Sequence, residues 1–201
     1  MRVNEALGQI AEIHDHLARA EQYRGFHPLA VAGSGLVGLA AAVVQPWLVP
    51  ADDPAAFVRF WLVVAAVGGA VGVSRAVDAY LRHEDEFARR RTRRVAGQFA
   101  PCVVAGLAVT FALAEASGDF ARCLPGLWTL LFGLGVFAAR PYLPHAIGWV
   151  ALFYLAAGAI LLATVPAELT WAGRAVGLTF AVGQVATAFV LRRNRERDAD
   201  V

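Results

Sequence analysis

The chain contains no lysine, and only 17% of its 201 residues are charged, compared with roughly 25% in soluble proteins. Hydrophobic residues make up 58% of the chain, against roughly 45–50% in soluble proteins. They gather in runs of about 20 residues, long enough to cross the roughly 30 Å hydrocarbon layer of a bilayer. The composition therefore argues against a soluble domain and predicts a membrane protein.

Cysteine is scarce as well, since the chain has only Cys102 and Cys123. In the topology derived below they lie near opposite faces of the membrane, whereas a disulfide needs Cα atoms within about 7 Å. Two distant cysteines also cannot form a metal site by themselves. The sequence therefore predicts no disulfide, and both residues are interpreted as small apolar fillers.

Residues 1–25 lack the apolar core of a cleavable signal peptide and carry several acids instead. Residues 4–24 predict an amphipathic helix with Asn4 as its N-cap. Its apolar face carries, at helical spacing, Leu7, Ile10, Ile13 and Leu17. The helix is too polar to span a membrane, so it is expected on the cytoplasmic surface. Because its polar face balances acids and bases, docking to another protein or to a second copy of this chain is favoured over attraction to anionic lipid.

Residues 26–191 predict a domain of six transmembrane helices, followed by a charged tail over 192–201. The expected spans are about 28–49, 55–75, 95–114, 120–139, 145–165 and 171–191. Helix is expected to continue beyond the second span, because residues 78–94 contain neither glycine nor proline. The predicted fold class is an all-α integral membrane protein, arranged as three helical hairpins.

Small residues recur at spacing four in the first two predicted spans, which lets a neighbouring helix approach closely. In the first span they are Ala30, Ser34, Gly38 and Ala42. In the second they are Gly68, Gly72 and Ala76. These two ridges are expected to pack spans or protomers together.

Arginine asymmetry predicts the orientation. The run from Arg82 to Arg94 is the longest charged stretch and is expected to stay in the cytoplasm. With both termini inside, 15 of the 18 arginines lie in cytoplasmic segments. The remaining three are Arg59, Arg122 and Arg174. The chain is therefore predicted to be a multi-pass protein of a bacterial inner (cytoplasmic) membrane, in contact with membrane lipid.

The three predicted outer loops share a pattern in which an acid precedes the single exterior arginine of that hairpin. The pairs are Asp52 with Arg59, Glu115 with Arg122, and Glu168 with Arg174. One interpretation is a repeat of three parallel hairpins, each closed by an acid–arginine pair. The alternative, which we favour, is that short loops of a membrane protein gather interfacial charges without common descent.

No charged residue or histidine falls near the middle of any predicted span, which weighs against ion-coupled transport. The deepest polar candidates for a pocket are Gln184 and Gln45. Gln184 is more simply explained as a hydrogen-bond partner of a neighbouring helix. Aromatic residues concentrate in the last four spans and could line a site for an apolar ligand, although filling voids between helices is the commoner role.

Signals for chemistry are weak. His27, His83 and His145 lie at cytoplasmic helix ends and could meet at a metal or haem, but helix-end histidines in solvent are the commoner case. Gly33-Ser34-Gly35 is no nucleophile elbow, and the glycine-rich patches lack a phosphate-loop lysine. The arginine run is explained by topology without nucleic acid. No enzyme activity, cofactor or metal is therefore predicted.

The leading hypothesis is a non-enzymatic membrane protein with a structural, sensory or partner-binding role. Its docking face would be the N-terminal helix together with the arginine run. The alternative is a passive channel or carrier for a small or apolar solute, and a lipid-handling enzyme comes third.

Overall fold

The computed structural model describes residues 26–82, 86–116 and 118–199, and within these ranges all regular structure is helical. The elements are α2 (Pro28–Leu48), α3 (Pro54–Arg82), α4 (Glu86–Ala116), the 3-10 helix η1 (Gly118–Arg122), α5 (Leu124–Ala139), the 3-10 helix η2 (Arg140–Tyr142), α6 (Ile147–Ala163) and α7 (Leu169–Ala199). The amphipathic helix predicted over 4–24 lies outside the described residues. The all-α prediction is confirmed for the part of the chain that is described.

Helices α3, α4 and α7 extend beyond the spans predicted at about 55–75, 95–114 and 171–191. Helix α3 continues to Arg82, as expected from a stretch without glycine or proline. The fourth predicted span, about 120–139, corresponds to the apolar helical stretch Phe120–Tyr142, in which the end of η1 precedes α5, which begins at Leu124. Pro125 accounts for this start, because a proline without an N–H fits the first helical turn. Helix α6 has 17 residues and is shorter than the span predicted over 145–165.

Side-chain caps begin two of the helices. Pro28 occupies the first turn of α2, and His27 is the N-cap. The His27 Nδ1 accepts a hydrogen bond of 3.3 Å from the Leu29 N–H. Asp53 caps α3 in the same way, since its Oδ1 accepts from the Ala56 N–H at 2.8 Å. These caps set where each chain segment enters the bundle.

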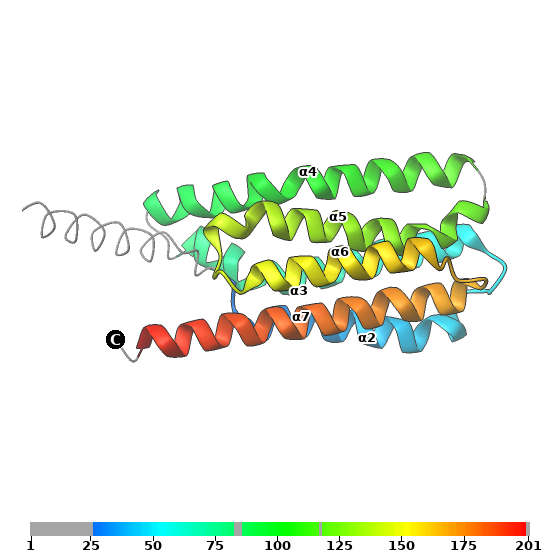
Figure 1. The fold of residues 1–201 in the computed structure, drawn as a ribbon. Helices are drawn as coiled ribbons and strands as arrows, with labels where there is room; N and C mark the ends of the chain where they lie inside the picture. Colours follow the sequence, from blue (N-terminus) through cyan, green and yellow to red (C-terminus); the bar gives the residue numbers. More distant parts are fainter. Residues whose placement is uncertain (1–25, 83–85, 117, 200–201) are drawn as a thin grey trace, which may run out of the picture.

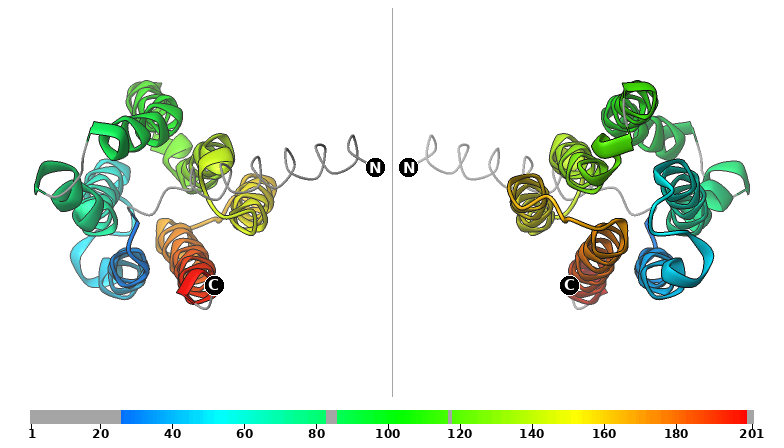
Figure 2. Two further views of the ribbon diagram at one scale, coloured as in Figure 1. Left: turned by 90° about the vertical axis from the view of Figure 1, so that its left-hand side faces the viewer. Right: turned by 90° about the vertical axis from the view of Figure 1, so that its right-hand side faces the viewer.

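The six long helices run along one common direction (Figure 1) and form a ring when viewed along it (Figure 2). The order around the ring follows the chain, from α2 to α7, and α7 closes onto α2. The most extensive contacts join α2 to α7 and α5 to α6, while α3 meets α4 over a much smaller area. The closest packing therefore joins helices of different predicted hairpins.

Small residues of α2 form its contacts with both neighbouring helices. The predicted ridge on α2 therefore packs against two helices instead of one. A Cβ atom placed on Gly72 of α3 would lie 3.4 Å from the Ser34 Cβ. On the other side of α2, a Cβ on Gly177 of α7 would lie 2.5 Å from the Ala42 Cβ and 2.7 Å from the Gly38 carbonyl oxygen. Helix α2 therefore lies between α3 and α7, with its backbone close to both.

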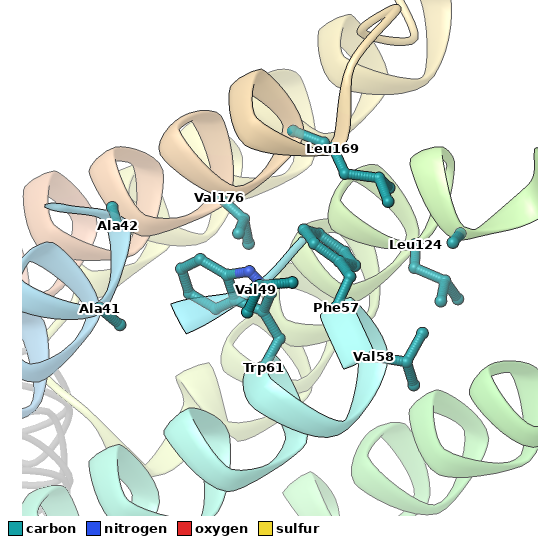
Figure 3. Close-up of a cluster of buried hydrophobic side chains, with 11 residues drawn as sticks. Ala41, Ala42, Val49, Phe57, Val58, Trp61, Leu124, Leu169 and Val176 are labelled. Carbon is teal, nitrogen blue, oxygen red and sulfur yellow. The ribbon is translucent and has the colours of Figure 1, made fainter. Parts of the chain in front are cut away.

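Two apolar clusters mark the two ends of the bundle. The larger one joins α2, α3, η1, α5 and α7 around the fully buried Phe57, and most of its members appear in Figure 3. The smaller one joins the ends of α3, α4 and α5 through Ala76, Val95 and Ala139, with Phe26 packed against them.

The outer surface of the ring is apolar. Exposed large side chains include Leu29, Trp47 and Trp149, each 76% exposed. Five helices or helical stretches are long and apolar enough to cross a membrane, and α6 is a shorter apolar helix beside them, all within the described part of the chain. A water-soluble protein does not expose such a surface, so the structure indicates a multi-pass membrane protein.

Candidate functional site

Gln45 lies near the C-terminal end of α2, is 1% exposed and has hydrogen-bond partners on two other helices. Its Nε2 donates a hydrogen bond of 3.2 Å to the Leu169 carbonyl oxygen of α7. Its Oε1 accepts one of 3.2 Å from the indole N–H of Trp61 on α3. A single side chain thus joins three helices, which we call the Gln45 junction.

The Gln45 junction is possible because α7 carries a glycine opposite Gln45. A Cβ atom on Gly173 would overlap the Gln45 amide, so only glycine leaves room for it. Gly177 follows one turn later and faces Ala42. Sequence reasoning missed both glycines, although their spacing of four is the same small-residue signal that it used for the first two spans.

Gln184, the other predicted pocket residue, is half-buried on α7 and packs against α2. A Cβ placed on Gly35 would lie 2.9 Å from the Gln184 Cβ. The interhelical hydrogen bonding expected of Gln184 is found instead at Gln45. A role of either glutamine in a ligand pocket stays a prediction.

An aromatic cluster fills the space between α4, α5, α6 and α7. The Phe132 ring lies 5.3 Å from Phe99, 4.9 Å from Tyr154 and 4.9 Å from Phe180, measured between ring centroids. Tyr154 is fully buried. Other aromatic side chains of these four helices are exposed instead, namely Phe111, Phe137, Trp149 and Phe153. The inward members therefore pack against one another, as expected of side chains that fill voids between helices.

The remaining buried polar side chains are also satisfied inside the bundle. The Trp128 indole N–H donates to the Thr110 hydroxyl at 2.8 Å, and that hydroxyl donates to the Gly106 carbonyl oxygen at 2.7 Å. Thr129 donates to the Pro125 carbonyl oxygen in the same manner. No buried side-chain polar atom of the described residues lacks a hydrogen-bond partner. In a medium without water, such satisfaction stabilises the helix contacts.

The histidines considered as metal ligands form no metal site among the described residues. His27 caps α2, His145 is exposed in the turn before α6, and His83 lies outside the described residues. In the ranges that the structure describes, no three His, Cys, Asp or Glu side chains gather in a way that could hold a metal ion. Cys102 and Cys123 are free thiols.

The outer acid–arginine pairs stay a prediction. Asp52, Arg59, Glu168 and Arg174 are all exposed, and the Glu115 side chain lies outside the described part. Arg174 lies over the Trp171 ring, 4.8 Å from its centroid. Arg122 ends η1 and is half-buried.

The fold and the interior together define an all-helical bundle of the membrane type. Its buried polar side chains form hydrogen bonds within the bundle. The chain matches no family model, no curated protein and no solved structure at a significant level.

Proposed function

We propose that this chain is a non-enzymatic multi-pass membrane protein with a structural or partner-binding role, in which the bundle anchors a cytoplasmic docking segment. The observation that carries this proposal is the packed interior. Gln45, Thr110 and Tyr154, which a transport path or a reaction would need to use, are engaged with neighbouring helices. The docking segment is the amphipathic helix predicted over residues 4–24.

The alternative function, a passive channel or carrier, has less support. A solute path needs polar groups or open space between the helices, and the space beside Tyr154 is occupied by the rings of Phe132 and Phe180. An apolar ligand would have to displace these rings from one another.

The proposed protein has both termini in the cytoplasm. The ends of the helices that meet in the smaller apolar cluster, around Ala76 and Val95, are the ends that carry most of the described arginines. Arg59, Arg122 and Arg174 belong to the segments around the larger cluster instead. Because arginine-rich segments stay in the cytoplasm, this distribution supports the predicted orientation. The same distribution of arginines between the two ends of the bundle is also expected of three parallel hairpins.

Single-cysteine labelling in intact cells tests this orientation. In a chain with Cys102 and Cys123 replaced by serine, we expect Asp52→Cys to react with a membrane-impermeant maleimide in whole cells. We expect Arg193→Cys to react only after lysis. Labelling of Arg193→Cys in whole cells would show that the C-terminal end lies outside.

Partner docking is tested by crosslinking in native membranes followed by purification of the full chain. We expect Ile10→Glu/Ile13→Glu to abolish partner recovery, because two buried charges oppose docking of the apolar face. The matched control is Gln9→Glu/Gln22→Glu, which adds the same charge to the polar face of the predicted helix and should leave recovery unchanged. Recovery of the same partners by wild type and Ile10→Glu/Ile13→Glu, or of none by either, would contradict the proposal.

A further inference from the structure

Exposed arginines lie at the start of α4, where charged residues give way to an apolar stretch: Arg89, Arg90, Arg93 and Arg94. The part of α4 that is apolar enough to cross a membrane is Thr92–Leu113. The last two arginines therefore lie in the first turn of this part, at the depth of the lipid headgroups when α4 spans a bilayer. Helix α4 thus brings positive charge and apolar surface together on one rigid element.

Contacts with two neighbouring helices hold the start of α4 in place. Val95 is buried in the smaller apolar cluster with Ala76 of α3 and Ala139 of α5. The Arg89 guanidinium lies over the Tyr80 ring of α3, 5.5 Å from its centroid. These contacts fix which face of α4 is turned toward the bundle and which face is turned away from it.

Gly97 lies between Arg93 and Arg94 on the surface of α4, one turn further along the helix. It follows Arg93 by four residues and Arg94 by three, and residues at these spacings are neighbours on a helix. All three residues are exposed. A Cβ atom placed on Gly97 would meet nothing within 4 Å, so the surface between the two arginines is open. A ligand can therefore approach the backbone of α4 between two guanidinium groups.

The charges of Arg93 and Arg94 are not neutralised by the described carboxylates. Glu86, the acid in the first turn of α4, pairs with Arg90 four residues later. In the described part of the chain, no ion pair includes Arg93 or Arg94. Guanidinium groups bind phosphate oxygens well, because their planar N–H donors match the spacing of these oxygens. The two arginines are therefore suited to a phosphate group from outside the chain.

Exposed apolar side chains continue the same face of α4 toward the other end of the bundle. Val104 and Phe111 follow Gly97 at intervals of seven residues, which is two helical turns. They are 64% and 61% exposed, and we call them the apolar stripe. Along this face the arginines, the open surface at Gly97 and the apolar stripe thus follow one another. A molecule with an anionic headgroup and hydrocarbon chains matches this order of surfaces.

We propose that this face of α4 binds one anionic phospholipid. The phosphate oxygens accept hydrogen bonds from the guanidinium groups of Arg93 and Arg94, and the glycerol group lies against the helix at Gly97. The acyl chains follow the apolar stripe. Phosphatidylcholine is bound more weakly, because its ammonium group is repelled by the two arginines. Free inorganic phosphate shares the headgroup chemistry, but it has no chains for the apolar stripe to hold.

Native mass spectrometry of the full chain, released from detergent after titration with phosphatidylglycerol or phosphatidylcholine, measures the lipid that is bound. We expect phosphatidylglycerol to bind about tenfold more tightly, and Arg93→Gln/Arg94→Gln to remove this preference, because two charge-assisted hydrogen bonds are lost. The matched control, Arg193→Gln/Arg197→Gln, removes the same charge from exposed positions at the end of α7. It should change binding less than about twofold. Circular dichroism verifies that each variant keeps its helices.

Gly97→Leu separates this site from a general attraction between charges, because it fills the open surface and leaves every arginine in place. We expect the variant to fold normally, since a Cβ at this position meets no neighbour. It should bind phosphatidylglycerol about threefold more weakly than the wild-type chain. Excess inorganic phosphate should not displace the lipid, because free phosphate makes no contact with the apolar stripe.

Four results would each overturn the proposal: equal binding of the two lipids, equal losses in the α7 control, unchanged binding in Gly97→Leu, or displacement of the lipid by inorganic phosphate. Because the measurement uses the whole chain in detergent, its outcome depends neither on the proposed orientation in the membrane nor on docking of the N-terminal segment.

Discussion

Replacing Gly177 by leucine is expected to lower the free energy of unfolding by about 3 kcal/mol or more, the upper part of the range for overpacked helix contacts. The first atom of the new side chain would lie 2.5 Å from the Ala42 Cβ and 2.7 Å from the Gly38 carbonyl oxygen. A backbone oxygen cannot rotate away as a side chain can. The most extensive helix contact of the bundle, α2 with α7, would therefore have to separate.

Gly69→Leu provides the matched control for this prediction. Gly69 lies on the exposed side of α3, and a Cβ placed there would meet nothing within 4 Å. Leucine also favours helix over glycine by about 1 kcal/mol, so this variant should be neutral or slightly more stable. Unfolding in mixed micelles of increasing SDS content, followed by circular dichroism, measures both. Similar losses in the two variants would mean that α2 and α7 do not pack as described.

Gln45→Leu is expected to cost about 2 kcal/mol of unfolding free energy, although leucine has a similar volume and is more apolar. The loss arises because the Trp61 indole N–H and the Leu169 carbonyl oxygen would each lose a partner inside the bundle. An unsatisfied buried polar group costs about 1–3 kcal/mol. A substitution toward greater hydrophobicity should therefore destabilise a membrane protein at this position.

Gln184→Leu is the control for the Gln45 junction, since both glutamines lie at the contact of α2 with α7. The Gln184 side chain forms no hydrogen bond with a described residue. Its replacement should therefore change the unfolding free energy by less than about 0.5 kcal/mol. The same SDS unfolding measurement applies, with the Trp61 indole N–H observed by NMR. Equal effects of the two substitutions would show that the hydrogen bonds of Gln45 contribute nothing.

The helices themselves were predictable because each depends on nearby residues. The start of α2 at residue 28 and the continuation of α3 to Arg82 were both predicted from local patterns. The fourth predicted span agrees with the apolar stretch Phe120–Tyr142, but the pattern did not show that residues 120–122 belong to the 3-10 helix η1 and that α5 begins beside Pro125. Local sequence patterns therefore predicted which segments are helical, but they located the helix ends less accurately.

The candidate sites were less predictable. Gln45 and Gln184 were both recognised as deep polar residues, but nothing in the local sequence shows that Trp61 and Leu169 lie beside Gln45. Gly173 likewise lies far from Gln45 along the chain, and the two residues meet only because α2 packs against α7.

The sequence by itself determined that this protein is a set of apolar helices with arginine-rich ends, because transfer into lipid and helix formation depend on each segment alone. Only the tertiary structure decided which helices are neighbours. In lipid the hydrophobic effect does not favour one helix face over another, so pairing depends on shape and hydrogen bonding between distant residues. The fit of Gly177 against Ala42, and of Gln45 against Gly173, is such a relation, and it appears in no local pattern.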